Sequence, residues 1–210
     1  MSRQPSQQPG TRPVVIGLAG GVASGKSAAA EAFAALGCRV LDSDREAGRL
    51  LQTPAVRDEL VRWWGPGVLD AEGRIDHRAV GAIVFTDPDQ RKRLEGLIHP
   101  LVIEAHDRDI HQAAADGIPA VVIDAPLLFE AGLDARCDAV VFLDTPQEQR
   151  VRRAAETRGW DEQELIRREK NQLPLENKRR RSHYTVTNDA ERSKLFGQIR
   201  EVFRAIMSNV

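Results

Sequence analysis

A glycine-rich stretch near the start of the chain has the residue types and the spacing of a phosphate-binding loop. Residues Gly20–Ser27 (GGVASGKS) match the pattern G-x-x-x-x-G-K-[ST] at every fixed position. The glycines allow backbone N–H groups to surround an anion, and the helix that follows adds the positive end of its dipole. We expect Lys26 to reach the β- and γ-phosphates of a nucleotide and the Ser27 hydroxyl to bind its Mg²⁺. The other nucleotide contacts are expected from Gly21, Val22, Ala23, Ser24, Gly25 and Ala28.

The segments on either side of this loop decide between a nucleotide site and a chance match. Val14–Ala19 is a nearly continuous apolar run, as in a buried parallel strand, and the alanine-rich stretch Ser27–Leu36 favours a helix that stops at Gly37. A strand, a glycine-rich turn and a helix in this order are the context that the motif requires. The loop therefore predicts nucleotide binding, but it does not distinguish kinases from GTPases or motor ATPases.

Two carboxylates follow a second apolar run, Cys38–Leu41, and could act on an acceptor hydroxyl. Asp42 and Asp44 stand at i and i+2, so in an extended segment both side chains would share a face. The carboxyl ends of parallel strands line the ligand crevice, where a carboxylate can orient a hydroxyl and accept its proton. The alternative is that Asp42 or Ser43 only caps a helix that begins near Arg45.

A third carboxylate, Asp124, ends another apolar run and is a candidate ligand of Mg²⁺ through water. The alternative is an Asp that only forms the turn before Pro126.

Positive charge is concentrated in residues 149–181. This segment holds eleven Lys or Arg and six Asp or Glu, an excess of five positive charges in a chain whose formal net charge is -1. Such a segment is typical of an arginine-bearing lid that closes over ATP, excludes water and stabilises the negative charge of a transferring phosphoryl group. The alternative is a solvated helical face with ion pairs between successive turns.

The remaining pattern alternates between strands and helices, which predicts a parallel sheet covered on both faces. Residues 45–117 contain helical patches and no confident strand, so we expect a helical insertion between strands of the sheet. An amphipathic helix over Glu191–Met207 should close the fold. The expected strands after the first two are Ala120–Ile123, Ala139–Leu143 and the short Val186–Thr187.

Length and composition exclude several classes of protein. A chain of 210 residues with 41% hydrophobic and 29% charged residues is typical of one soluble globular domain. The net charge of -1 argues against a nucleic-acid or membrane partner, and no apolar run approaches the ~20 residues of a membrane span. The two cysteines are far apart, which argues against a zinc site and fits a cytoplasmic protein. We expect the polar residues Met1–Pro13 to be a disordered leader.

Taken in order, several stretches resemble the dephospho-CoA kinase family, from about Val14 to the closing helix. No later stretch is diagnostic alone, but their order and spacing together are specific. They are Ile16–Ser27, Val40–Asp44, Gly65–Asp76, Val84-Phe85, Leu94–Pro100, Asp124–Glu130, Gln172–Lys178 and Asn188.

The resemblance implies that the chain transfers a phosphoryl group from ATP-Mg²⁺ to the ribose 3′-hydroxyl of dephospho-CoA. It implies a three-layer α/β P-loop fold with a parallel sheet, in one domain over residues 14–210. The core would be residues 14–44, 118–148 and 182–210, with a substrate-binding insertion at about 45–117 and a lid at about 149–181. The partners would be these small molecules only, and the protein a monomer or a weak homo-oligomer.

The resemblance also assigns roles to residues. Asp44 would be the base, and Arg153 and Arg158 would be lid residues that contact ATP, with Arg152 as a possible match in their place. Asn188 would bind ATP. The residues expected to bind dephospho-CoA are Asp42, Asp44, His99, Pro126 and Leu127.

Some positions depart from the family's pattern. Ala23 and Ala28 replace a common Gly and Thr, which the loop motif does not require. His77 stands where an Arg is common, and Ser182-His183 replaces a common Ala-Asp, so we assign no function to these positions.

Two rival functions remain from the sequence. Another small-molecule or nucleoside kinase would share the loop and the lid, but not the stretches GPGVLDAEGRID and LEGLIHP. A regulatory NTPase switch would give the Asp42/Asp44 pair no role, and the chain has no N-K-x-D guanine signature.

Overall fold

The computed structural model describes residues 12–170, 172–189 and 191–209, so most of the predicted leader lies outside the described residues. The chain separates into two compact units. The first unit comprises the residues up to Asp42 and those from Asp109 onward, and the second comprises Ser43–Arg108.

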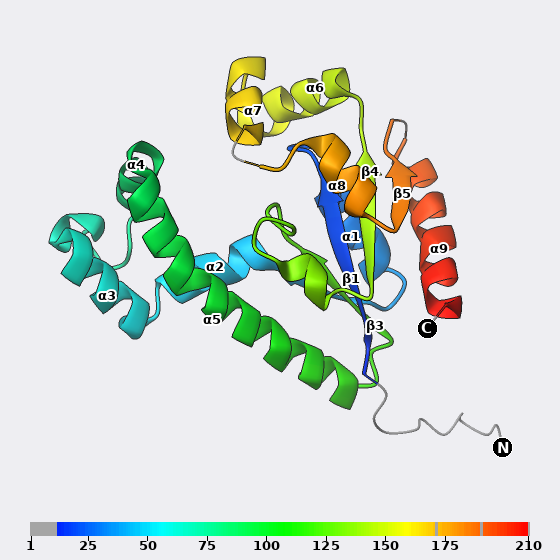
Figure 1. Ribbon diagram of the computed structural model, residues 1–210, viewed down its shortest axis with the longest axis horizontal. Helices are drawn as coiled ribbons and strands as arrows, with labels where there is room; N and C mark the ends of the chain where they lie inside the picture. Colours follow the sequence, from blue (N-terminus) through cyan, green and yellow to red (C-terminus); the bar gives the residue numbers. More distant parts are fainter. Residues whose placement is uncertain (1–11, 171, 190, 210) are drawn as a thin grey trace. The chain divides into compact units, whose positions relative to one another are not determined.

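A five-stranded, fully parallel sheet forms the centre of the first unit (Figure 1), in the order β2-β3-β1-β4-β5. The predicted strands are confirmed, and β5 begins two residues before its predicted start. The strands are β1 (Val14–Gly20), β2 (Arg39–Asp42), β3 (Ala120–Asp124), β4 (Ala139–Asp144) and β5 (Tyr184–Thr187). All seven residues of β1 are buried, as expected for the central strand of a covered parallel sheet.

One face of the sheet packs against α1 (Lys26–Ala34) and α9 (Arg192–Ser208). Alternate residues of β1, Val14, Ile16 and Leu18, contribute to this core. Phe33 of α1 and Ile199 of α9 are fully buried there. The predicted apolar stripe of the closing helix therefore faces the sheet.

The opposite face is covered by the segment after β3 and by α8 (Leu175–Arg181), which contacts β1 and β4. At Gly17 a Cβ would lie 2.8 Å from the Sγ of Cys137 and from a methyl carbon of Leu128, so a larger residue would have to displace these two side chains. A 3₁₀ turn, η2 (Leu133–Arg136), leads from this segment back to β4.

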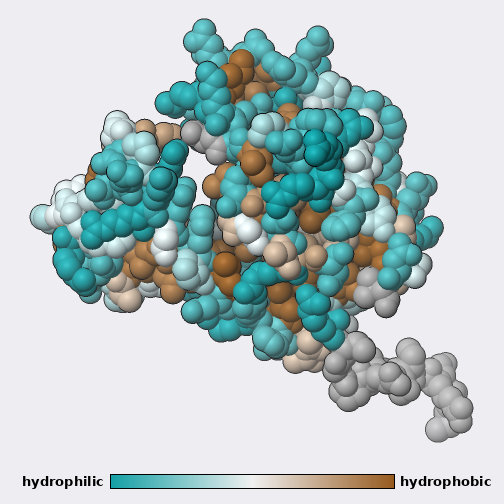
Figure 2. All heavy atoms as spheres, viewed as in Figure 1, coloured by the Kyte–Doolittle hydropathy of each residue, from teal (hydrophilic) through white to brown (hydrophobic). Residues whose placement is uncertain are grey.

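The positively charged segment forms α6 (Gln147–Arg158) and α7 (Glu162–Glu169), followed by α8. Ala154 of α6 and Leu165 of α7 are buried in a small core with Val22 of the glycine-rich loop. In the view of Figure 2, hydrophilic side chains cover most of α6 and α7, with a small hydrophobic patch among them. These helices therefore pack on the loop through few apolar contacts.

The second unit is helical around its own apolar core. Among its residues, 43–108, the structure has no named strand, only an isolated bridge between Leu69 and Ile75. The helix α5 begins in this unit and ends in the first. The elements are α2 (Ser43–Leu51), α3 (Pro54–Trp64), the 3₁₀ turn η1 (Pro66–Val68), α4 (His77–Thr86) and α5 (Pro88–Ala115).

One local prediction is wrong. The expectation that Asp42 and Asp44 share a face of an extended segment fails, because α2 begins at Ser43, directly after β2. Asp44 is thus in the first turn of a helix, where an acidic side chain is favoured by the helix dipole. In the described part of the chain, no helix is long and apolar enough to cross a membrane.

Candidate active site

The glycine-rich loop has the backbone of a phosphate cradle. Gly25 has φ 90° and Ala23 has φ 57°, both in the left-handed region, and α1 begins at Lys26. The N–H of Ser24 donates to the carbonyl of Gly21 at 3.2 Å, which makes a tight turn. The Nζ of Lys26 donates to the same carbonyl at 3.4 Å, so its ammonium lies next to the loop. This arrangement can bind the phosphates of a nucleotide.

Two polar side chains from distant strands hold this loop at its centre. The hydroxyl of Thr145, just after β4, donates to the carbonyl of Ser24 at 2.9 Å. The amide of Asn188, just after β5, donates to the same carbonyl at 2.8 Å. A Cβ at Gly25 would clash with the amide nitrogen of Asn188, so this packing requires glycine there. The structure thus brings Asn188, a predicted ATP residue, to the phosphate loop.

Arg153 of α6 also lies at the loop. Its Nη2 is 3.4 Å from the carbonyl oxygen of Asn188 and from the side-chain oxygens of Asn188 and Gln149. Its Nη1 is buried and has no hydrogen-bond partner among the residues that the structure describes. Nη1 would lie 3.4 Å from a Cβ at Gly25. A guanidinium N–H in this position can donate to an oxygen of a bound nucleotide.

The other predicted lid arginine has a different environment. The guanidinium of Arg158 lies 4.7 Å from the ring centre of Trp160, and that of Arg168 lies 3.9 Å from the same ring. Both distances are in the range of cation–π contacts. The structure therefore places Arg158 on the aromatic residue between α6 and α7, and its contact with ATP stays a prediction. Arg152, the other possible match, is exposed.

A buried ion pair at the loop was not predicted. Arg150 of α6 is only 4% exposed, its Nη1 pairs with the carboxylate of Glu169 on α7, and its Nε donates to the carbonyl of Thr145 at 3.2 Å. The same carboxylate oxygen accepts a hydrogen bond from the N–H of Val22 at 3.0 Å. This pair ties α6 and α7 to the loop. The available sequence signal was the position of Arg150 one turn before Ala154, on the buried face of α6.

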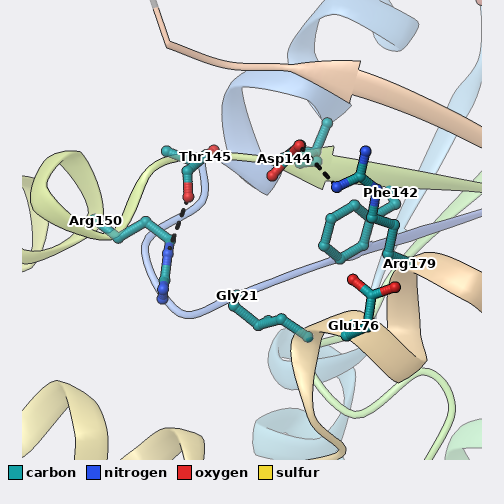
Figure 3. A pocket seen from close by; sticks show the side chains of 9 residues that line it. Gly21, Phe142, Asp144, Thr145, Arg150, Glu176 and Arg179 are labelled. Carbon is teal, nitrogen blue, oxygen red and sulfur yellow. Dashed lines mark hydrogen bonds and ion pairs between the residues drawn. The ribbon is translucent and has the colours of Figure 1, made fainter.

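A pocket opens beside this ion pair, at the carboxyl end of β4 (Figure 3). Gly21 of the loop and Arg150 line one side of it. Glu176 and Arg179 come from α8, and Arg179 lies 3.6 Å from the carboxylate of Asp144. The wall of the pocket thus carries charged side chains of both signs, and Phe142, Leu143 and Leu175 add apolar surface to it.

Two of the predicted acidic residues meet at the sheet. Asp42 ends β2 and Asp124 ends β3, and they are partners in the register of these strands. Leu18 of β1 is the partner of Asp124 on the other side, two residues before the loop begins. Pro126 and Leu127 follow Asp124 directly. All of these residues therefore lie at or just past the carboxyl edge of the sheet, which is the usual location of ligands in parallel sheets.

Asp44 and His99 belong to the second unit, on α2 and α5 respectively. Next to Asp44, the hydroxyl of Ser43 lies 3.5 Å from Nε2 of His106, which is buried. Glu46 lies about one turn after Ser43 in α2. A side-chain hydrogen bond from Arg49 is the main cause that lowers the pKa of Glu46. The roles of Asp44 and His99 stay predictions.

The described residues, 12–170, 172–189 and 191–209, contain no cluster of three or more His, Cys, Asp or Glu that could hold a metal ion. A site for Mg²⁺ does not need such a cluster, because that ion usually takes one or two protein oxygens and fills its other positions with phosphate oxygens and water. Ser27 is exposed and Asp124 is half-buried.

Comparisons with known proteins identify the family. A family model of dephospho-CoA kinases matches residues 14–194. A dephospho-CoA kinase of Corynebacterium diphtheriae is 35% identical over 198 residues, which cover 93% of this chain and 98% of that protein. A dephospho-CoA kinase from Deinococcus radiodurans is 36% identical over 206 residues, which cover 98% of this chain and 99% of that protein.

Solved structures agree with the fold. A crystal structure of a Thermus thermophilus protein has a TM-score of 0.81 at 33% identity, with 93% of this chain and 98% of that chain covered. The fold is also that of a dephospho-CoA kinase from Campylobacter jejuni, with a TM-score of 0.69 at 23% identity over 93% and 98% of the two chains. The chain has a parallel five-stranded sheet and a complete phosphate loop, and the family model matches it over nearly its full length. The chain therefore belongs to the dephospho-CoA kinase family.

Proposed function

We propose that this chain transfers the γ-phosphoryl group of ATP to the ribose 3′-hydroxyl of dephospho-CoA, giving CoA and ADP. Membership of the family supports the acceptor. The observation that carries the proposal is the loop Gly20–Ser27, held by Asn188 and Thr145, with a buried N–H of Arg153 beside it. A site of this kind binds a nucleotide and places positive charge around its terminal phosphates.

In the proposed reaction, the 3′-oxygen of dephospho-CoA attacks the γ-phosphorus, and the bond from that phosphorus to the β–γ bridging oxygen breaks. Asp44 orients the hydroxyl and accepts its proton, and Asp42, His99, Pro126 and Leu127 hold the acceptor. Lys26 and the lid arginines, Arg153 and Arg158, stabilise the charge on the transferring group. Loop amides of residues 21–28 bind the phosphates, and Asn188 completes the ATP site.

Magnesium is the proposed cofactor, and Ser27 would hold it directly while Asp124 would hold it through water. When bound, the ion neutralises negative charge on the β- and γ-phosphates. The hydroxyl of Ser27, at the second residue of α1, is positioned by the start of that helix. Asp124 is positioned by the pairing of β3 with β1 and β2.

The proposal extends to the architecture and the setting of the enzyme. Residues 14–210 would act as one kinase domain, with the helical insertion binding dephospho-CoA. The lid would be the segment at about 149–181, which contains α6, α7 and α8. We also propose that the protein acts in the cytoplasm on small molecules alone, as a monomer or a weak homo-oligomer. Size-exclusion chromatography with light scattering would test the oligomeric state.

The central test is an ADP-release assay with ATP-Mg²⁺, with and without dephospho-CoA. We expect ADP release that depends on dephospho-CoA and produces CoA in equal amount. Nucleosides, nucleoside monophosphates and shikimate should give little release at the same concentration. ADP release without any acceptor would instead indicate an NTPase switch, and a preference for another acceptor would indicate another kinase of this fold.

The variant Asp44→Asn tests the proposed base. It keeps the size of the side chain and removes its ability to accept a proton at neutral pH. We expect kcat to fall about 10²–10³-fold while the Kd of ATP changes little, because a general base contributes on this scale. Turnover close to that of the wild type would exclude Asp44 as the base.

A further inference from the structure

A lysine in the first unit is buried almost completely, which is unusual for this residue type. Lys178 of α8 is 1% exposed, and its side chain is 2% exposed. Its ammonium is close to three oxygen atoms. These are Oε1 of Gln172 at 2.8 Å, Oε1 of Glu130 at 3.0 Å and the carbonyl oxygen of Pro126 at 3.2 Å. An ammonium has three N–H donors, so the three acceptors can satisfy it completely.

These contacts join two segments that are far apart in the chain. Pro126 and Glu130 lie in the turn after β3, whereas Gln172 lies between α7 and α8. Glu130 strengthens the junction, because its Oε1 also accepts a hydrogen bond from the N–H of Leu173 at 2.7 Å. The ammonium is therefore the centre of a polar network between the turn and the segment that follows α7.

Further contacts hold the same turn against α8. Arg181 pairs with Asp134 at 2.6 Å, and its guanidinium lies 4.5 Å from the ring centre of Phe129. Within the turn, the N–H of Ala131 donates to the carbonyl of Leu127 at 2.8 Å. The backbone of the turn is thus fixed at the carbonyl groups of Pro126 and Leu127, the two residues for which we propose contact with dephospho-CoA.

A purely structural role does not explain the choice of residue well. Removing an ammonium and a carboxylate from water is costly, and a buried ion pair can often be replaced by apolar residues without loss of stability. An apolar side chain at position 178 could fill the space but could not hold the carbonyl of Pro126. What the ammonium adds is a defined orientation of that carbonyl and of the turn that follows.

We propose that Lys178 is a positioning residue of the acceptor site. Its ammonium holds the turn Pro126–Glu130 in the conformation that binds dephospho-CoA, and it ties this turn to the segment after α7. The proposal rests on the proposed function, because it assumes that Pro126 and Leu127 contact the acceptor. Lys178 acts through these residues and does not touch the reacting atoms.

The test compares Lys178→Met with Arg180→Met in steady-state assays that vary dephospho-CoA and ATP separately. Arg180 is exposed on the same helix, so its substitution removes one positive charge from α8 without opening the network. We expect Lys178→Met to raise the KM of dephospho-CoA about tenfold and to leave the KM of ATP within about twofold. Small misplacements of bound groups have effects of this size or larger. For Arg180→Met we expect both constants to stay within about twofold of the wild-type values.

The double variant Lys178→Met with Glu130→Gln separates positioning from stability. It leaves no carboxylate without its cation in this network, so it should fold even if Lys178→Met alone does not. We expect its Tm to approach that of the wild type while the KM of dephospho-CoA remains about tenfold higher. A folded variant with both KM values unchanged would overturn the proposal, as would an equal rise of both.

Hydrogen exchange provides a readout that does not depend on the reaction. The amides of residues 127–134 should exchange at least about tenfold faster in the double variant than in Arg180→Met. Unchanged exchange would overturn the positioning role even if activity fell. If the wild-type protein released no ADP with dephospho-CoA, the proposed function would fail, and this exchange experiment would still decide whether Lys178 holds the turn.

Discussion

Gly25 shows how a single residue can define the phosphate loop. Its φ of 90° lies in the left-handed region, and a Cβ there would clash with the side-chain amide of Asn188. Alanine at this position would therefore strain the backbone and push Asn188 away from the carbonyl of Ser24. The backbone strain and the displacement of Asn188 affect the same loop, so both should weaken nucleotide binding.

We predict that Gly25→Ala weakens ATP binding at least about tenfold, measured as the Kd by calorimetry. The matched control is Gly37→Ala, since Gly37 has a φ of 89° and nothing within 4 Å of an added Cβ. This control carries only the backbone strain of about 1–2 kcal/mol. It should lower the Tm and leave the Kd of ATP nearly unchanged. Equal effects of both substitutions on the Kd would argue against a role of the Asn188 contact.

The two cysteines lead to a prediction about reactivity. Burial raises the pKa of both Cys38 and Cys137 to about 12, so both remain thiols at neutral pH. We predict slow alkylation by iodoacetamide at pH 8 in the native protein and fast alkylation in urea, followed by mass spectrometry. Rapid native labelling of either cysteine would contradict this burial.

The same pKa shifts fix the sign of a pH effect on stability. The ordinary pKa of these thiols is 9.0, and the folded-state values are higher. Below pH 9 the thiols are protonated in both the folded and the unfolded state, so their contribution to the free energy of unfolding is fully present. Between pH 9 and about 12 the unfolded chain loses these protons first, so the free energy of unfolding falls as the pH rises.

Sequence reasoning identified the residues of the loop because the motif encodes their local geometry. It did not identify the partners of that loop from spacing, because Glu169 is 147 positions from Val22 in the chain. Asn188 was available only through the family resemblance, which also singled out Arg153 among the arginines of the charged segment. The environment of Lys178 had no local signal either, since the lysine precedes three arginines in a stretch that looks solvated.

At the scale of elements, the apolar runs predicted the strands well because buried parallel strands have few polar residues. The edge strands were less clear. β5 has one buried residue, Val186, and its other residues have the alternating exposure of a half-covered edge. The start of α2 was predicted too late, because Ser43 and Asp44 are favourable both before a helix and in its first turn.

The ion pair of Arg150 with Glu169 joins α6 and α7, the helices of the proposed lid. Arg150→Met would leave the Glu169 carboxylate beside the loop without its cation, and this negative charge would repel the phosphates of ATP. We predict that Arg150→Met raises the Kd of ATP about tenfold or more, measured by fluorescent-nucleotide titration. Adding Glu169→Gln to this variant should recover part of the affinity, because it removes the repelling charge.

The control for the lid variant is Arg167→Gln on α7. Arg167 also pairs with a glutamate, Glu164, but its side chain is 62% exposed. Exposed ion pairs contribute little, typically about 0–1 kcal/mol, so the Kd of ATP should stay within about twofold. If Arg150→Met behaved like this control, the buried pair would have no part in ATP binding.

At the scale of the whole molecule, the chain has two units with separate apolar cores. The predicted insertion, residues 45–117, overlaps most of the second unit, Ser43–Arg108. Its exact limits could not be read from the sequence, because α5 continues from one unit into the other without a break in its helical pattern. The role of the insertion in binding dephospho-CoA stays a prediction.

The division into units predicts how ligands protect the chain from hydrogen exchange. The phosphate loop, Thr145, Arg153 and Asn188 all belong to the first unit. ATP-Mg²⁺ at about 100 times its Kd should stabilise the states that bind it by about 2.7 kcal/mol. We therefore predict slower exchange in β1, α1 and α6, measured by mass spectrometry.

Hydrogen exchange at the amides of α3 and α4 that open locally should slow little when ATP alone is added. It should slow more after dephospho-CoA is added. Equal protection of both units by ATP alone would show that nucleotide binding already involves the second unit.

The order of strands has a consequence for synthesis of the chain. The neighbours of β1, at the centre of the sheet, are β3 and β4, which begin at residues 120 and 139. Ribosomes add roughly 5–20 residues per second. The neighbouring strands of β1 are therefore synthesised only on the order of ten seconds after β1 itself. A nascent chain must keep this segment from aggregating until then. Nucleotide therefore cannot assist the early stages of folding, because its cradle is completed only after Asn188 has left the ribosome.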